Sequence, residues 1–144
     1  MNDLRFEPVS GDVGLSDWQH VHNLIIPTDP LTAAEVRERA GRNRLEVAYL
    51  GDTLVGCSTV RPPTEGTATV IARVLPAYRR QGIGTRLYTH VLAYARSLGP
   101  AVIETVVLES NADGLRFAEA RGFVEIERYL LPGDTVPYVD LRLA

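Results

Sequence analysis

The spacing of apolar and polar residues divides the chain into strands and helices. Seven segments either alternate between apolar and polar positions or are short apolar runs between turn residues, and both patterns predict strands. The predicted strands are residues 4–9, 46–50, 53–60, 66–75, 101–108, 123–131 and 136–143. A helical period is clearest over residues 84–97, where Leu87, Val91 and Tyr94 share one face.

Two capping boxes predict two short helices after the first strand. Ser16, with Gln19 three residues later, predicts a helix that begins at Ser16. It ends before Pro27, because a proline disfavours helical backbone in the residue that precedes it. Thr32 with Glu35 predicts the start of the second helix in the same way.

Asn111 is a suitable N-cap for a last helix, which ends at Gly122. The resulting order of elements is β-α-α-β-β-β-α-β-α-β-β, which predicts an α/β fold with helices on the faces of a mixed sheet. The sequence contains no internal repeat, low-complexity segment or linker. Residues 1–144 are therefore expected to form a single domain.

The turn between the strand 66–75 and the helix 84–97 combines a basic pair with two glycines. Arg79 and Arg80 are followed by Gly82 and Gly84, and the helical period starts at once. The first N–H groups of a helix have no partner within it, and the helix dipole favours an anion there. Glycine lets an anion approach the backbone because it has no Cβ atom. The sequence therefore predicts a phosphate or pyrophosphate cradle in this turn.

Composition and charge narrow the classes of protein that fit this pattern. The chain has 144 residues, of which 45% are hydrophobic and 23% are charged, as in an ordinary globular domain. Its net charge of −3 argues against nucleic acid as a partner. Cys57 is the single cysteine, which excludes an intramolecular disulfide and a multi-cysteine metal site. No apolar run has membrane-spanning length and the first residues do not resemble a signal peptide, so we predict a cytoplasmic protein with no membrane partner.

The cradle belongs to a longer motif that begins in the preceding strand. The motif is Val74-x-Pro76-x-x-Arg79-x-x-Gly82-x-Gly84. Further along, Asn111 is followed eleven residues later by Gly122-Phe123. In this order and spacing, the chain resembles the GNAT superfamily of acetyl-CoA-dependent N-acetyltransferases over essentially its whole length. The resemblance implies a mixed, mostly antiparallel sheet of about seven strands with four helices on its faces, splayed between the fourth and fifth strands.

The resemblance also implies a function. The protein is expected to transfer an acetyl group from acetyl-CoA, its co-substrate, directly to an amine of a small-molecule or peptide acceptor, with no metal. In the superfamily the first two helices and the last hairpin usually line the acceptor pocket. Members often form homodimers, and a homodimer is therefore one expected assembly here.

Cofactor-binding positions follow from the resemblance, residue by residue. Backbone amides that hold the CoA pyrophosphate correspond to Arg79, Arg80, Gln81, Gly82, Ile83, Gly84 and Thr85. The backbone that pairs with the pantetheine arm, like an added strand, corresponds to Ala72, Arg73 and Val74. The asparagine near the pantetheine corresponds to Asn111.

The catalytic positions depart from the superfamily pattern. Ala118 stands where many members have a tyrosine acid, and Val106 where some have a glutamate base. Glu104 is the alternative base, because it shares a strand face with Val106 and because burial in an apolar run raises the pKa of a carboxyl. A salt bridge or a solvent-facing strand end would equally explain this glutamate. Tyr129 and Tyr138, in the late strands, are substitute acids or else sheet-packing residues.

Two further possibilities stay open at this point. His20 and His22 lie two residues apart on the first helix and so do not share a face, and one of them could contact the acceptor. The chain could also be a non-catalytic acetyl-CoA-binding sensor, or one half of a tandem protein whose partner performs the chemistry. A site for another nucleotide is disfavoured, because the turn lacks the Lys-Ser/Thr pair of an ATP-binding loop.

Overall fold

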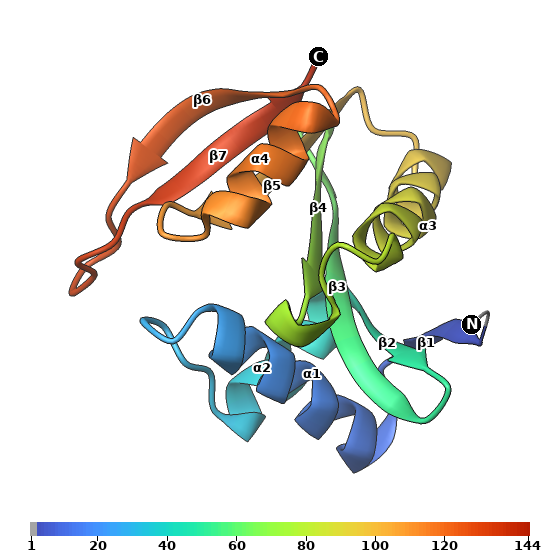
Figure 1. The fold of residues 1–144 in the computed structure, drawn as a ribbon. Helices are drawn as coiled ribbons and strands as arrows, with labels where there is room; N and C mark the ends of the chain where they lie inside the picture. The colour runs from blue at the N-terminus through green and yellow to red at the C-terminus, as the bar shows by residue number, and fades with distance from the viewer. Residues whose placement is uncertain (1–2) are drawn as a thin grey trace.

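The computed structural model describes residues 3–144. In these residues, seven strands form one mixed sheet in the order β1-β2-β3-β4-β5-β7-β6 (Figure 1). The strands are β1 (Leu4–Pro8), β2 (Arg44–Leu50), β3 (Thr53–Thr64), β4 (Thr67–Val74), β5 (Val102–Leu108), β6 (Phe123–Tyr129) and β7 (Tyr138–Leu143). Every neighbouring pair is antiparallel except β4 and β5, which are parallel. The predicted α/β class and mostly antiparallel sheet are confirmed.

Four helices cover the two faces of this sheet, as predicted. They are α1 (Gly11–Ile25), α2 (Ala33–Arg42), α3 (Ile83–Ser97) and α4 (Ala112–Ala120), and a single 3-10 turn, Pro76–Tyr78, precedes α3. The pair α1 and α2 packs on one face, and α3 with α4 packs on the other (Figure 1). Among residues 3–144, no helix is long and apolar enough to cross a membrane.

The start of α1 differs from the prediction that Ser16 caps it. The helix begins at Gly11 with Ser10 in the N-cap position, and Ser16 is an exposed residue inside it. Leu15 explains the difference, because it packs in the same cluster as Trp18 and extends the apolar face by one turn. Ser16 and Gln19 do not form a capping box, because Gln19 Nε2 instead donates to the carbonyl of Leu31 at 2.8 Å.

The other two predicted caps are confirmed by their hydrogen bonds. The backbone N–H of Thr32 donates to Glu35 Oε1 at 2.8 Å, and the N–H of Glu35 donates to Thr32 Oγ1 at 3.2 Å. At the start of α4, the N–H of Gly114 donates to Asn111 Oδ1 at 3.0 Å. Both helices thus begin at residues whose side chains satisfy otherwise unpaired backbone donors.

The sheet opens between β4 and β5. The two strands pair only where Thr67–Thr69 lie beside Val102–Glu104. Beyond that point, β4 pairs with β3 alone and β5 pairs with β7 alone, which confirms the predicted splay. One backbone edge of β4 is therefore free from Val70 onward.

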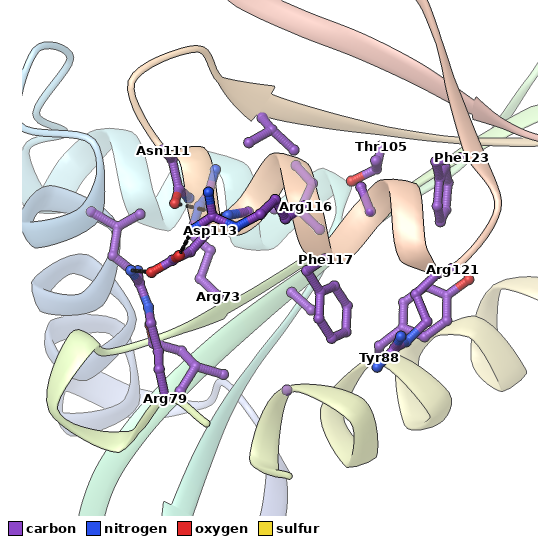
Figure 2. Close-up of a pocket in the computed structure, with 18 of the residues that line it drawn as sticks. Arg73, Arg79, Tyr88, Thr105, Asn111, Asp113, Arg116, Phe117, Arg121 and Phe123 are labelled. Atoms are coloured by element: carbon purple, nitrogen blue, oxygen red, sulfur yellow. Dashed lines mark hydrogen bonds and ion pairs between the residues drawn. The ribbon is translucent and has the colours of Figure 1, made fainter. Parts of the chain in front are cut away.

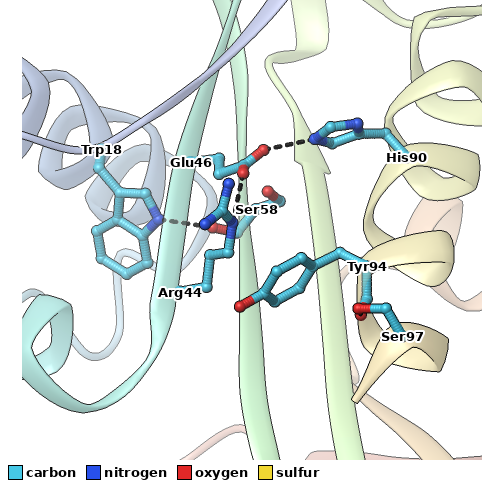
Figure 3. A network of polar contacts seen from close by, with 7 residues as sticks. All are labelled: Trp18, Arg44, Glu46, Ser58, His90, Tyr94 and Ser97. Carbon is cyan, nitrogen blue, oxygen red and sulfur yellow. Dashed lines mark hydrogen bonds and ion pairs between the residues drawn. The ribbon is translucent and has the colours of Figure 1, made fainter. Parts of the chain in front are cut away.

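A buried polar network holds α3 against β2 on one face of the sheet (Figure 3). Glu46 is only 4% exposed, and its carboxylate accepts hydrogen bonds from Arg44 Nε and His90 Nε2, both at 2.7 Å. Arg44 also lies over the ring of Tyr94 at 4.5 Å. Because His90 and Tyr94 are on α3, this network fixes the helix whose N-terminus forms the predicted cradle.

Candidate active site

A cavity of about 430 Å³ occupies the opening between β4 and β5 (Figure 2). Residues from both faces of the sheet line it, so the cavity passes from one face to the other. On one side these are residues of α3 and α4, such as Gly84, Tyr88 and Phe117. On the other side they are Ile25, at the end of α1, and Ile26, which follows it.

The turn before α3 has the backbone geometry of an anion site. Gly82 is the N-cap, with φ of 80°, and Arg80 also has a positive φ, 65°, which is uncommon for a residue with a side chain. The first bond into the helix runs from the N–H of Arg86 to the carbonyl of Gly82, at 3.2 Å. The N–H groups of the residues between them have no partner within the helix. Together with the helix dipole, these free donors favour a bound anion.

The structure brings most of the predicted cofactor residues to the cavity. Its lining includes Ala72, Arg73, Val74, Arg79, Arg80, Gly82, Gly84, Thr85 and Asn111. Gln81 is exposed, and the side chain of Ile83 is buried in the core below α3. These two can face the cavity only through their backbone, and their binding role stays a prediction.

A basic rim surrounds the cradle, and sequence reasoning missed most of it. Arg116 of α4 and Arg121, the residue that caps the end of this helix, line the cavity opposite the turn. Arg121 Nη2 donates to Thr85 Oγ1 at 2.7 Å, and its guanidinium lies 4.3 Å from the ring centre of Phe117. Spacing could have indicated this arrangement, because Phe117 and Arg121 are four residues apart and share a helix face.

The side chain of Arg79 crosses the mouth of the opening. Its Nε donates to the carbonyl of Val74 at 2.9 Å, and its Nη1 lies 3.5 Å from Asp113 Oδ2 (Figure 2). Arg79 therefore links the end of β4 to the start of α4. Its guanidinium belongs to the wall of the cavity as well as to the predicted cradle.

Tyr88 and Thr105 are two more lining residues that the sequence did not single out. Tyr88 contacts Phe117 and Phe123 edge-on, with ring centres 5.9 and 6.0 Å apart. It lies four residues after Gly84, on the same face of α3. Thr105 follows Glu104, the last residue of β5 that pairs with β4, and only the splay of the sheet exposes it to the cavity.

The predicted base Glu104 lies outside the lining of the cavity. Its carboxylate accepts hydrogen bonds from Arg142 Nη2 at 2.7 Å and Arg142 Nε at 3.1 Å, across the β5–β7 pair. Glu104 is therefore held in a salt bridge, which was the alternative explanation from sequence. It still shares a strand face with Val106, which does line the cavity.

The predicted acids Tyr129 and Tyr138 stack on the α1 side of the sheet with ring centres 6.0 Å apart. Tyr129 donates to Asp140 Oδ1 at 3.0 Å, and Tyr138 donates to Asp29 Oδ2 at 3.1 Å. Burial, with the neighbouring carboxylate, raises the pKa of each tyrosine to about 12. Burial also raises the pKa of Asp140. Both hydroxyls hold their protons tightly, so neither protonates a thiolate readily.

The two histidines of α1 have different surroundings. His20 is exposed, whereas His22 is 3% exposed and stacks on Trp18 with ring centres 5.3 Å apart. His22 Nε2 lies 3.2 Å from the carbonyl oxygen of Asp29. Burial, followed by the nearby charge of Arg73, lowers the pKa of His22 to about 4. His22 is therefore a neutral core residue at neutral pH and does not line the cavity.

A family model described as the acetyltransferase (GNAT) family matches residues 15–123. The chain belongs to the GNAT family of acetyltransferases. A comparison with curated protein sequences finds no significant match.

Solved structures of GNAT proteins have the same fold. The yncA protein of Salmonella typhimurium, determined with its cofactor acetyl-CoA, has a TM-score of 0.77 at 14% identity, covering 99% of this chain and 94% of that one. The ribosomal-protein-S18-alanine N-acetyltransferase of Escherichia coli has a TM-score of 0.76 at 19% identity, covering 97% and 92%. A GNAT family acetyltransferase of Elizabethkingia anophelis, with acetyl-CoA bound, has a TM-score of 0.72 at 16% identity, covering 99% of both chains. The predicted fold is thus confirmed.

Proposed function

We propose that this GNAT protein transfers the acetyl group of acetyl-CoA directly to the amine nitrogen of a small molecule or peptide. The observation that carries the proposal is the cavity that passes through the splayed sheet. Its α3 end has an anion cradle, and its α1 end lies on the opposite face of the sheet, where Ile25 and Ile26 line it. A donor and an acceptor can therefore meet in the opening from opposite faces.

The residues at the α3 end suit acetyl-CoA. Free N–H groups of the cradle and the guanidinium groups of the rim match the phosphates of this polyanion. The free edge of β4, from Ala72 to Val74, can pair with the amides of the pantetheine arm. When bound, acetyl-CoA supplies the activated acetyl group as a thioester. Acetyl-CoA in the structures of yncA and the Elizabethkingia protein supports the same assignment.

We assign removal of the proton from the acceptor amine to the face of the sheet that carries Glu104 and Tyr129. The acceptor amine must lose a proton in order to attack. Glu104 lies two residues from Val106 on one face of β5, so its carboxylate can take that proton through a water molecule. Tyr129 and Asp140 form the second candidate pair. No dedicated acid is required for the thiolate, because a free thiol has a pKa of about 8.5.

A non-catalytic acetyl-CoA-binding module is the second candidate. Ala118 is the observation that favours it, because this residue lines the cavity where many GNAT members have a tyrosine. In that case the cradle and β4 edge bind acetyl-CoA, but no acetylated product forms.

The test is turnover with a panel of amines, measured both as free CoA and as acetylated product by mass spectrometry. We expect product with at least one amine and a fall in kcat of about 100-fold for Glu104→Gln. Arg142→Gln is the matched control, since it breaks the same salt bridge but keeps the carboxylate. Full activity of Glu104→Gln would exclude Glu104 as the base. Acetyl-CoA binding without any product would favour the binding module, and no binding would contradict both candidates.

A further inference from the structure

An arginine with no ion-pair partner among residues 3–144 lies at the α1 end of the cavity. Arg73 is on β4, is half-buried and lines the cavity. Its partner in the β3–β4 register is Cys57, which packs in the core below α1 and α2. Antiparallel partners share a face of the sheet, so the side chain of Arg73 faces α1 rather than the cradle.

Several side chains near Arg73 are neutral or positive. Cys57 and Tyr138 have pKa values raised by burial to about 11 and about 12, and His22 has one lowered to about 4. All three are therefore uncharged at neutral pH, and the remaining neighbour, Arg61, is a cation.

Three carboxylates of this face accept hydrogen bonds from other residues, and none of them forms an ion pair with Arg73. Asp29 accepts from Tyr138, Asp140 from Tyr129, and Glu104 from Arg142. Among the ion pairs within residues 3–144, none involves Arg73, Arg61 or Arg39. Arg39, on α2, is a third guanidinium of this face and lies near Arg61.

A partly buried guanidinium without a charged partner is costly, and a bound anion would offset that cost. We infer that the acceptor is an amine that also carries an anionic group, a carboxylate or phosphonate, and that this group binds Arg73. The inference rests on the proposed function, since it names the class of acceptor for the same cavity. Arg61 and Arg39 strengthen the positive field at this end.

The rest of the α1 end is apolar. Ile25, Ile26, Ile71, Val106 and Leu108 line it beside Arg73. The acceptor class that fits is therefore a small amine with an apolar body and one anion, such as an apolar amino acid. Polyamines and other multiply charged cations are disfavoured, because Arg73 in the cavity wall repels them and Arg61 and Arg39, outside the lining, add to the positive charge of this face.

The experiment compares amines that differ only in the anion. Phenylalanine is paired with 2-phenylethylamine, and tryptophan with tryptamine, and kcat/KM is measured for each with saturating acetyl-CoA. We expect the carboxylate-bearing member of each pair to be preferred at least tenfold, since hydrogen bonds to charged groups have effects of about 10- to 100-fold. Arg73→Gln should bring that ratio close to one. Arg96→Gln, an exposed arginine away from the cavity, should leave the ratio unchanged.

Equal rates for both members of each pair, with a ratio that Arg73→Gln does not change, would overturn the inference while leaving the proposed function intact. A variant that loses acetyl-CoA affinity but keeps the carboxylate preference would also overturn it, because Arg73 would then serve the cofactor.

A binding measurement tests the inference on the wild-type protein, so it requires neither turnover nor a variant that folds. With CoA present, calorimetry on the wild-type protein should detect 3-phenylpropionate and not the uncharged 3-phenylpropanol. Equal binding of both compounds, or binding of neither, would contradict an anion site. If no amine at all is acetylated, the proposed function fails and this measurement still decides whether the anion site exists.

Discussion

The α3 end and the α1 end of the cavity are built from different parts of the chain. The α3 end uses one continuous segment, the turn from Arg79 to Thr85, and presents backbone N–H groups. The α1 end collects side chains from separate elements, among them Arg73 of β4, Ile25 of α1 and Val106 of β5. Backbone donors suit any phosphate, whereas a particular set of side chains selects one acceptor. The comparison therefore separates what is shared within a family from what is specific to one chain.

Placing a negative charge in the cradle should have the largest effect on the α3 end, where it should weaken the binding of acetyl-CoA. Gly82→Asp sets a carboxylate beside the bound phosphates, and two unit charges about 4 Å apart near a protein surface interact with about 4 kcal/mol. We expect the Kd of acetyl-CoA, measured by calorimetry, to rise at least about 100-fold. Gly82→Asn is the matched control, with similar size and similar tolerance of a positive φ. Equal affinities of the two variants would show that the phosphates do not bind at this turn.

His22 makes the α1 side sensitive to acid. Its pKa is lowered to about 4 in the folded protein, from the ordinary histidine value of 6.5 that the unfolded chain keeps. Between these values the unfolded chain binds the proton and the folded chain does not, so the free energy of unfolding falls as the pH decreases from 6.5 to 4. The loss approaches about 3 kcal/mol, since one pKa unit corresponds to about 1.4 kcal/mol.

Chemical denaturation at several pH values measures this effect of His22. His22→Phe keeps the stacking on Trp18 but cannot be protonated, so its stability should depend less on pH in that window. The exposed His20 gives the control, His20→Gln, which should keep the wild-type slope. Identical slopes for His22→Phe and the wild type would assign the acid sensitivity to other groups.

Arg121 tests whether the basic rim belongs to the cofactor end. Its bond to Thr85 and its contact with Phe117 hold it beside the cradle, and such contacts each contribute about 1 kcal/mol. Arg121→Gln should therefore raise the Kd of acetyl-CoA, measured by calorimetry, three- to tenfold, while Arg96→Gln should leave this Kd unchanged. A change in the kcat/KM of the amine without any change in this Kd would move Arg121 to the acceptor side.

Substitution of Asp113 should have the smallest effect on the binding of acetyl-CoA. It is a carboxylate at the edge of the cradle and is paired with Arg79 and Arg116. Asp113→Asn removes a partly exposed anion, so the Kd of acetyl-CoA should fall two- to threefold at low salt and less at high salt. The matched change Glu119→Gln, on the same helix but outside the cavity lining, should have no effect. Weaker binding of Asp113→Asn would show that the pair with Arg79 shapes the cradle.

The same contrast explains how much could be predicted from sequence. The turn before α3, the caps at Thr32 and Asn111 and the order of the elements along the chain depend on neighbouring residues or on a continuous motif, and the sequence pattern was sufficient for them. The start of α1 was predicted wrongly because Leu15, which extends its apolar face, was not counted. The positions of Arg121 and Thr105 in the cavity wall could not be predicted, because they depend on how elements far apart in the sequence pack together. The salt bridge of Glu104 depends on the β5–β7 register, which pairs residues 38 positions apart.

An NMR titration of the isotope-labelled protein with acetyl-CoA is the most direct test of cofactor binding at the cradle and the β4 edge. We expect saturable changes that are largest for the amides of residues 72–74 along the free β4 edge and 83–85 at the start of α3. The paired strands β1 and β2 should change little, and Gly82→Asp should abolish the changes at the same ligand concentration. No saturable change at millimolar acetyl-CoA, or changes centred on β1 and β2, would contradict cofactor binding at the cradle and the β4 edge.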